Sequence, residues 1–341
     1  MRTTHLLLPI LACSLLIYSC NTGKEALEPK TVIPVSGFQD NIIDLSDFVS
    51  SSHNIELLPK GDLPMAPIID FDLRDSMLYT LGADGTISIF SAKTGKVLAS
   101  KNHIGHGQGE FIEPTIIKHD GKYINVLDFK QKTIFSFNDR LNFVKKTTFD
   151  FQPLDFARVK EGYLLYNLQG KHQKGNVVLT DNEGKRLESY TLNNKKIEFA
   201  LSNKVFSQNG SDIYFVEPMQ NDIYHWTEGN IEKTATIDFD EGEGKTVRWS
   251  DPLQDHRSHL KSTVVCGKYI ISQFTAPDKF VYTNVFDREK TSSKTGLVST
   301  HSQYPFLPMK TQGTTLYGIT ESVSAQGHYS VVLLCYKIRR I

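Results

Sequence analysis

The sequence has no excess of charge of either sign, since 38 Lys and Arg residues balance 38 Asp and Glu residues. Nucleic-acid-binding proteins normally carry a basic excess or a basic stripe, so this balance argues against that class of function. The chain also lacks an apolar run of the roughly 18 residues that a transmembrane helix needs. With 39% hydrophobic and 22% charged residues, its composition is that of a folded globular protein.

Cysteine is scarce, with four in 341 residues, and no CxxC or Cys/His spacing typical of a zinc site is present. Cys13 and Cys20 belong to the N-terminal segment described next. Cys266 and Cys335 lie in apolar, strand-like runs. We expect both to be buried free thiols, because free cysteine packs as a small hydrophobic residue. A disulfide between them is the alternative in an oxidising compartment.

The first twenty residues predict a signal peptide. Arg2 precedes a mostly apolar stretch, residues 6–18, which is too short to span a bilayer. The stretch I-Y-S-C at 17–20 resembles the lipobox of bacterial lipoproteins, which makes Cys20 the predicted lipidation site. The alternative is an ordinary secretory signal in which Cys20 has no role. The lipoprotein interpretation implies a location in the bacterial envelope, lipid-anchored to the outer membrane and facing the periplasm or the cell surface.

Residues 21–40 are polar, contain prolines and are predicted to form a flexible tether. After one short helical turn expected at 44–48, hydrophobicity alternates with period two almost everywhere, which predicts strands. The segments 68–73, 77–81, 86–90 and 97–99 form one group, and a turn at Ala83-Asp84-Gly85 indicates a hairpin. Six such groups recur at periods of about 40 to 58 residues.

Four-stranded units of this kind cannot bury both faces alone, so they must stack. Stacking around an axis gives the predicted fold, an all-β, six-bladed antiparallel β-propeller over residues 41–341 in which each blade is a four-stranded meander. The sixth group ends with the chain. We therefore expect an N-terminal strand at 54–58 to join the last blade and close the ring.

One segment carries a resemblance to a known family. Residues 104–111, with the sequence I-G-H-G-Q-G-E-F, look like a Gly-rich loop of six-bladed propeller lipoproteins of Bacteroidetes, with Gln108 where that family has proline. The segments 43–47, 223–226 and 332–338 are similar to the same family. The resemblance extends from about residue 40 to the C-terminus. It implies a TolB-like or NHL-like propeller exported as a lipoprotein.

The Gly-rich loop is also the candidate binding loop of the sequence, with the residues Gly105, His106, Gly107, Gln108, Gly109 and Glu110. Its backbone N–H groups would be able to cradle an anion. The interpretation that we favour is an inter-blade turn, in which glycine allows close approach and Glu110 accepts hydrogen bonds from backbone amides.

Candidate metal ligands are scattered along the chain. His256 and His259 have a metal-like spacing but lie in a predicted loop, and residues 238–243 are acidic without the ligand pattern of a calcium loop. Inner strands would be able to direct some polar side chains at the axis. The candidates are Asp70, Asp72, Asn125, Asp128, Asn221 and Asp222, and three histidines cluster in sequence, namely His103, His106 and His119. No cofactor is predicted, with calcium or zinc as the open alternative.

No GxSxG motif supports a nucleophile-elbow hydrolase, and no catalytic residue is assigned. Most aromatic residues should fill blade interfaces, while a few at the propeller mouth would be able to contact a ligand, among them Phe151, Tyr304 and Phe306. The predicted function is non-enzymatic binding of a peptide, glycan or envelope protein on one propeller face. The alternative is a hydrolase or lyase that acts through a metal ion or an axial histidine in the channel.

Overall fold

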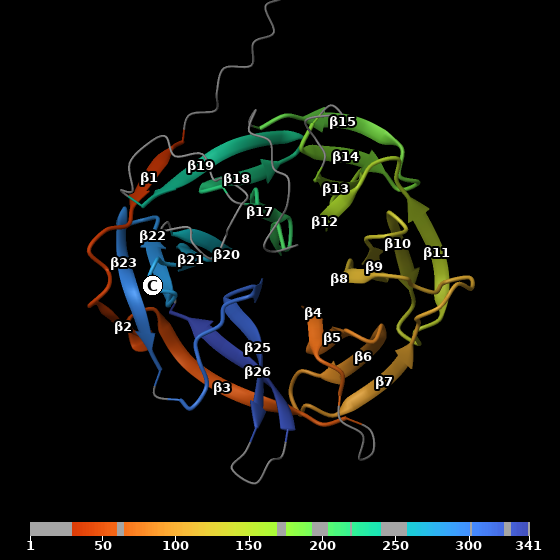
Figure 1. Ribbon diagram of the computed structural model, residues 1–341, viewed down its shortest axis with the longest axis horizontal. Helices are drawn as coiled ribbons and strands as arrows, with labels where there is room; N and C mark the ends of the chain where they lie inside the picture. The colour runs from red at the N-terminus through yellow and green to blue at the C-terminus, as the bar shows by residue number, and fades with distance from the viewer. Residues whose placement is uncertain are drawn as a thin grey trace, which may run out of the picture.

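Six small sheets surround a central axis in the computed structural model of this protein (Figure 1). The structure describes residues 29–59, 65–168, 175–192, 204–218, 220–239, 258–300, 302–323 and 329–339. Within these ranges the one helical segment is a 3₁₀ turn, η1 (Leu45–Asp47), and no helix there is long and apolar enough to cross a membrane. The fold is a six-bladed β-propeller, as predicted, and the expected helical turn at 44–48 is confirmed.

Each blade is an antiparallel meander that runs outward from an innermost strand near the axis. Blade 1 contains β4 (Ile68–Arg74), β5 (Met77–Gly82), β6 (Thr86–Ser91) and β7 (Val97–Asn102). Blade 2 contains β8 (Pro114–His119), β9 (Ile124–Asp128), β10 (Thr133–Phe137) and β11 (Phe143–Thr148). Blade 3 contains β12 (Pro153–Arg158), β13 (Gly162–Asn167), β14 (Val177–Asp181) and β15 (Arg186–Tyr190).

Blade 4 contains β16 (Phe206–Asn209), β17 (Asp212–Val216), β18 (Asp222–Thr227) and β19 (Asn230–Asp238). Blade 5 contains β20 (His259–Cys266), β21 (Tyr269–Thr275), β22 (Val281–Asp287) and β23 (Ser292–Ser299). Blade 6 contains β24 (Lys310–Gln312), β25 (Thr315–Val323) and β26 (Tyr329–Ile338). Blade 6 takes its fourth strand from the N-terminal part of the chain.

The tight turns follow from local sequence. Between β5 and β6, Gly85 has a φ of +76°, which a side chain would strain. The Asp84 carboxylate accepts hydrogen bonds from the Thr86 backbone N–H (3.0 Å) and from its hydroxyl (2.8 Å). Such Asp-Gly turns between alternating runs are the local signal from which the meanders were predicted.

The N-terminal segment wraps around the outside of three blades. β1 (Thr31–Pro34) pairs in parallel with β19, β2 (Ile42–Asp44) pairs in parallel with β23, and β3 (Val49–Leu57) pairs antiparallel with β26. In the β3–β26 ladder, Leu57 lies opposite Val331 and Ile55 opposite Leu333. The predicted closure of the ring by an N-terminal strand is therefore confirmed, and the strand begins earlier than expected.

Part of the predicted tether is not a flexible linker. Residues 21–28, together with the predicted signal peptide at 1–20, lie outside the described residues. Residues 31–34 instead form β1, and Ile33 and Val35 are completely buried against blades 4 and 5. Proline does not prevent this pairing, because Pro34 lies at the end of an outermost strand, where a backbone N–H is not needed.

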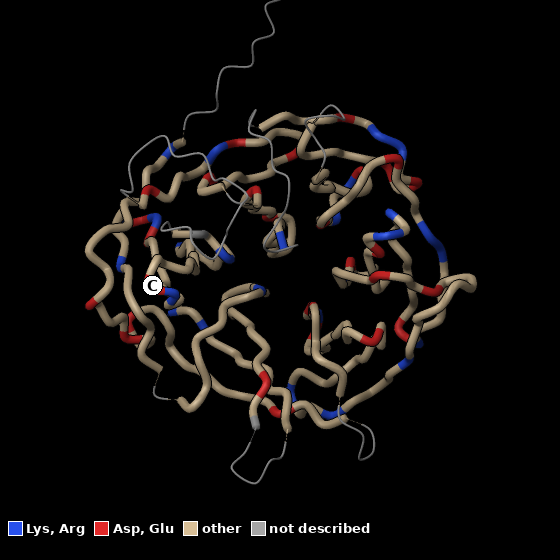
Figure 2. Tube along the Cα trace, in the orientation of Figure 1, with Lys and Arg blue, Asp and Glu red and all other residues tan. Residues whose placement is uncertain are grey.

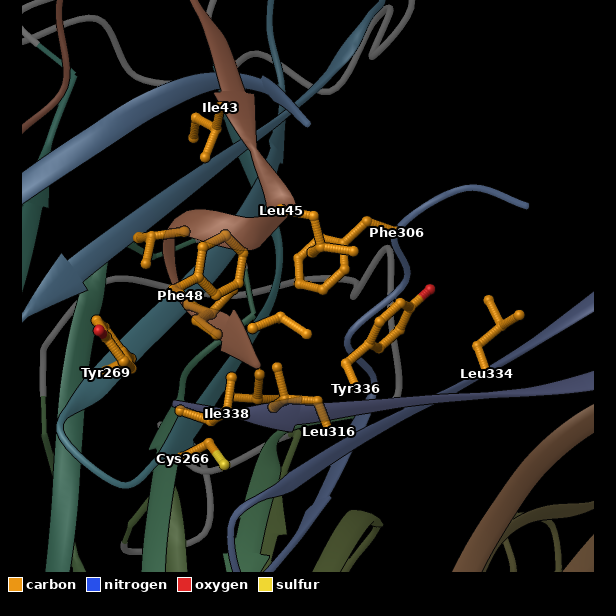
Figure 3. Packing of buried hydrophobic residues seen from close by; sticks show 14 of the residues in the cluster. Ile43, Leu45, Phe48, Cys266, Tyr269, Phe306, Leu316, Leu334, Tyr336 and Ile338 are labelled. Atoms are coloured by element: carbon orange, nitrogen blue, oxygen red, sulfur yellow. The ribbon is translucent and has the colours of Figure 1, made fainter. Parts of the chain in front are cut away.

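Apolar clusters between neighbouring blades form the core. One of them joins Phe48, just after η1, to Tyr269 of blade 5 and to Tyr336 and Ile338 of blade 6, as Figure 3 shows. The Phe48 and Phe306 ring centroids are 5.6 Å apart in an edge-to-face arrangement. The wrapped N-terminal segment is thus part of the core as well as of the sheets.

Cys266 and Cys335 are buried free thiols, which confirms the interpretation favoured from the sequence. Burial raises the pKa of Cys335 to about 12. Since the thiolate is the nucleophile, we expect iodoacetamide at about pH 8 to alkylate Cys335 of the folded protein at least tenfold more slowly than the cysteine of an S292C variant, which is exposed. Peptide mass spectrometry after timed labelling measures both rates, and equal rates would contradict the prediction. In guanidinium chloride, which unfolds the protein, the two alkylation rates should become equal.

Candidate functional site

Paired charges lie at the axis of the propeller. Figure 2 shows basic and acidic positions at the inner ends of several blades. Asp70, on β4, is 1% exposed, and its Oδ1 lies 3.3 Å from the Nζ atoms of both Lys204 and Lys310. Its Oδ2 accepts a hydrogen bond from the Ile117 backbone N–H at 2.9 Å. Burial by itself would raise the pKa of Asp70, but the two lysines lower it below its usual value.

A second pair joins blades 2, 3 and 4. The Lys118 Nζ lies 2.8 Å from the Asp155 Oδ1, and it also donates to the Phe156 carbonyl. The Asp155 Oδ2 accepts hydrogen bonds from the backbone N–H groups of Val205 and Phe206, each at 2.8 Å. Burial lowers the pKa of Lys118 despite the neighbouring carboxylate. Asp155 therefore fastens the start of β16 to blade 3.

Asp72 links blades 1 and 2 through a similar side-chain to backbone hydrogen bond. Its Oδ2 accepts a hydrogen bond from the His119 backbone N–H at 2.7 Å. Burial raises the pKa of Asp72, and Lys310 only partly opposes that effect. The three carboxylates thus serve as clamps between neighbouring blades, and lysines are the counter-ions of Asp70 and Asp155. This donor set does not fit a divalent cation, because the ammonium groups occupy the electrostatic role that the cation would take.

Of the six polar residues proposed for the channel, only Asp70 and Asp72 lie on an innermost strand. Asn125 and Asp222 lie on β9 and β18, and Asp128 ends β9, where it accepts from the Glu113 and Gln131 backbone N–H groups. Asn221 precedes β18, and its carbonyl accepts from the Ile237 N–H. Asn125 accepts a hydrogen bond from the Ser136 hydroxyl at 2.7 Å, and Asp222 accepts one from the Thr236 hydroxyl at 2.6 Å, so both serve contacts within their own blades.

The three histidines grouped in the sequence occupy separate surroundings. His103 is buried with its ring centroid 4.4 Å from that of Phe137, and burial lowers its pKa. His119 stacks on Tyr79 at 4.6 Å, while His106 is exposed. Within the described ranges, no three His, Cys, Asp or Glu side chains come together as a metal site. His256, the His259 side chain and residues 240–243 lie outside the described residues.

The Gly-rich loop is an inter-blade turn that contains its own anion. The Glu110 Oε2 accepts a hydrogen bond from the Gly107 backbone N–H at 2.7 Å, and the Gly105 N–H donates to the Phe111 carbonyl at 3.0 Å. A Cβ at position 105 would lie 2.0 Å from the Glu110 Oε2. These contacts agree with the turn interpretation, because the Glu110 carboxylate holds the position that an external anion would take.

We expect Gly109→Ala to lower the free energy of unfolding by about 2 to 3 kcal/mol. Gly109 has a φ of +79°, and a Cβ there would lie 2.5 Å from the Phe143 ring. Gly267→Ala is the matched control, since Gly267 has a φ of +59° with no atom within 4 Å of the added Cβ, and should cost only about 1 kcal/mol. Urea unfolding of both variants measures the difference. Equal losses would show that the Phe143 contact has no effect.

A pocket of about 760 Å³ opens over blades 4, 5 and 6. Its polar lining consists of Lys204, Ser207, Glu217, Lys261, Ser262, Thr263, Gln273 and Thr283. Its apolar lining consists of Val205, Phe206, Val216, Pro218, Leu260, Val281, Leu297, Val298, Pro305, Phe306, Leu307 and Met309. The pocket lies on the face where the innermost strands begin, because its lining includes the starts of β16 and β20 and the ends of β17 and β23.

Two polar groups of the pocket lining are held in fixed positions. Glu217 is completely buried and accepts a hydrogen bond from the Tyr166 hydroxyl at 3.2 Å. The Gln273 side-chain amide donates to the Phe306 carbonyl at 3.1 Å. Apolar walls with a small number of positioned polar groups are typical of ligand sites, and the volume falls in the usual range of roughly 300 to 1,000 Å³. Such a pocket is able to bind and orient a ligand.

Comparison with known proteins agrees with this architecture. Residues 30–327 match the family described as "Domain of unknown function (DUF4934)". The chain belongs to the DUF4934 family. No curated protein matches it. Among solved structures, this DUF4934 chain resembles a "Putative exported protein" from Bacteroides fragilis NCTC 9343, with a TM-score of 0.74 and 14% identity over 91% of this chain and 100% of that one.

A second similar structure is a member of the DUF4221 family from Bacteroides vulgatus ATCC 8482. It has a TM-score of 0.57 and 10% identity, and it covers 86% of the DUF4934 chain and 98% of its own. At these identities the two structures support the fold alone. Their shared architecture agrees with the ring of six sheets described above.

Only part of this DUF4934 pocket was predicted from the sequence. Of the three aromatic residues proposed for the mouth, Phe306 lines the pocket, Tyr304 packs beside it, and Phe151 is completely buried between blades 2 and 3. Lys204 and Glu217 carry no local signal in the sequence, because they join the site only through the packing of three separate blades. The predicted binding loop at 105–110 is not part of the pocket lining.

Proposed function

We propose that this DUF4934 protein is a non-enzymatic envelope lipoprotein that binds a peptide, glycan or protein partner in the pocket over blades 4 to 6. The observation that carries the proposal is the pocket itself, about 760 Å³ in volume with mostly apolar walls. The axial groups support binding over catalysis, because Asp70 is engaged by two lysines and a backbone N–H group, and Asp155 by one lysine and by backbone N–H groups. Carboxylates committed in this way are poor general bases.

The envelope location rests on the lipobox-like residues 17–20 and on the resemblance to a structure described as a "Putative exported protein". The TolB-like or NHL-like relationship stays a prediction. β1 runs parallel to β19, which ends at the pocket face, so Lys30 lies toward the opposite face, where it pairs with Glu232 at 2.6 Å.

We expect Cys20→Ser to abolish lipid attachment and to move the protein from the membrane fraction to the soluble fraction of the envelope. Metabolic labelling with a fatty-acid analogue, followed by fractionation of the host cells, measures both effects. Cys13→Ser is the control and should change neither. A wild-type protein that is unlabelled and soluble would overturn the lipoprotein assignment and leave an ordinary secretory signal. Full labelling of the Cys20→Ser protein would contradict lipidation at Cys20.

Binding is tested with peptide and glycan arrays probed by the purified domain, residues 21–341. Ser262→Trp should abolish binding by filling the pocket, since Ser262 belongs to its lining. Ser292→Trp is the matched control, because Ser292 is exposed at the start of β23, at the other end of blade 5. Binding that survives Ser262→Trp would place the binding site elsewhere, and no binding on either array would contradict the proposal.

A further inference from the structure

The opening of the pocket is bordered by exposed apolar side chains of blade 5. Phe280 is 60% exposed, Val281 39% and Leu297 36%. Val281 and Leu297 also belong to the pocket lining, and Phe280 directly precedes Val281 at the tip of the β21–β22 hairpin. We call these three residues the blade 5 rim. Exposed apolar groups that continue into an apolar pocket are typical of an interaction site rather than of ordinary surface.

The charged side chains of the pocket lining differ in their exposure to solvent. Glu217 is completely buried. Lys204 has a side chain 25% exposed and is already 3.3 Å from Asp70. Lys261, on β20, is exposed. An incoming ligand therefore meets an ammonium group at the opening, beside the apolar rim. A carboxylate on the ligand would be attracted there, and a cationic ligand would be repelled.

We propose that the occupant of this pocket is an extended acidic peptide segment, with a bulky apolar side chain in the pocket and a carboxylate against Lys261. This inference rests on the proposed binding function and specifies its ligand. The lining favours a peptide over a glycan, because most of its apolar side chains are aliphatic, whereas sugar hydroxyls need many polar partners. Apolar anchors in a desolvated pocket with charges at the border are the usual arrangement at protein interfaces.

The test uses an array of short synthetic peptides in which a central Leu, Phe or Gly is combined with flanking Asp, Ser or Lys. The labelled domain should bind the peptides that combine Leu or Phe with Asp. Lys261→Glu should weaken that binding by about tenfold or more and shift preference toward the Lys-containing peptides. Phe280→Ala should weaken binding of all apolar-centred peptides by a similar factor.

Two matched controls separate these effects from general changes. Lys290→Glu makes the same charge change in the exposed β22–β23 turn, at the opposite end of blade 5. Leu98→Ala removes an apolar side chain that is 55% exposed on β7, far from the rim in the ring. Both should leave the peptide profile unchanged, and the thermal unfolding of all four variants checks that they fold.

The outcomes distinguish this inference from the function on which it rests. Binding of apolar-acidic peptides that is lost in Lys261→Glu but kept in Lys290→Glu supports it. Peptide binding that ignores the acidic residue, or binding confined to the glycan array, overturns the acidic-peptide inference and leaves the proposed binding function standing. Absence of binding on both arrays overturns both.

Discussion

Removing residues 1–58 is expected to abolish the folded monomer, because this truncation deletes β3. Without β3, the whole of β26 becomes an open edge from Val331 to Ile338, and the blade 6 sheet loses its outermost strand. Leu57, 2% exposed, and Val49, 5% exposed, would also leave the core. We expect a loss of at least about 5 kcal/mol, which is the order of the total stability of a domain. Circular dichroism on heating and size-exclusion chromatography measure the result.

A circular permutant provides the control for this truncation. β3 begins where β26 ends, with Val49 opposite Ile338, so a short linker after residue 339 is able to return residues 49–58 as a hairpin strand. A chain that begins at residue 60 and ends with this added strand should fold as a monomer. A truncated chain that melts cooperatively near the temperature of the full-length protein would show that β3 is not needed to close the ring.

Asp70→Asn is expected to lower the free energy of unfolding at neutral pH by about 3 kcal/mol or more. The substitution keeps an acceptor for the Ile117 N–H but removes the charge that lies 3.3 Å from both Lys204 and Lys310. The Lys204 and Lys310 ammonium groups then lose the attraction of that carboxylate, while the repulsion between them remains. Replacing one of them in the Asp70→Asn/Lys310→Met double variant should recover part of the loss. A double variant less stable than the sum of its single changes would contradict this account.

Asp70 should also make the stability of the protein depend on pH in the acid range. Because the folded-state pKa of Asp70 lies below its ordinary value of 3.8, its ionised form contributes stability that is fully present above about pH 4 and is lost as the pH falls through the folded-state pKa. The Asp70→Asn protein should therefore lose less stability between about pH 4 and pH 2 than the wild type. Urea unfolding across that range measures the slopes, and parallel curves would contradict the prediction.

Asp72→Asn is the comparison variant, since the pKa of Asp72 is shifted in the opposite direction from that of Asp70. Burial raises the pKa of Asp72, so its contribution to stability is fully present below 3.8 and is lost as the pH rises through the folded-state pKa. Substituting asparagine, which resembles the protonated acid, should leave the acid-induced loss at least as steep as in the wild type. The two variants thus separate a lysine-paired carboxylate from one that is controlled by burial.

Local patterns in the sequence determined most of the fold. Period-two alternation fixes which side chains of a strand face a neighbouring blade, and turns such as Asp84-Gly85 fix where each strand reverses. Six repeats and an unpaired last blade were enough to predict the ring and its closing strand. The tether prediction was wrong for residues 31–34, because proline and polarity are local signals, whereas β1 is held by pairing with β19, about 200 residues away in the chain.

The Gly-rich loop and the axial charges show which features local sequence does and does not predict. The sequence of the loop was sufficient to predict a turn in which Glu110 accepts from a backbone N–H, since donor and acceptor are three residues apart. The axial clamps were predicted only in part, because the sequence indicated Asp70 and Asp72 as channel residues but did not indicate Lys118, Lys204 or Lys310. Each of these lysines is paired with a side chain from another blade, which packing brings within about 3 Å. The spacing of residues along the chain does not predict which side chain that is.

The sequence by itself therefore determined the strands, their turns, the number of blades and the buried state of Cys266 and Cys335, all of which depend on interactions between residues close in the chain or on side-chain hydrophobicity. The tertiary structure alone decided the pocket, the pairing of the axial charges and the course of the N-terminal segment. Lys204, Lys261 and Phe306 come from three parts of the chain and meet over blades 4 to 6 only after the ring has closed. The physical reason is that a site built across blades depends on long-range packing, which no local pattern encodes.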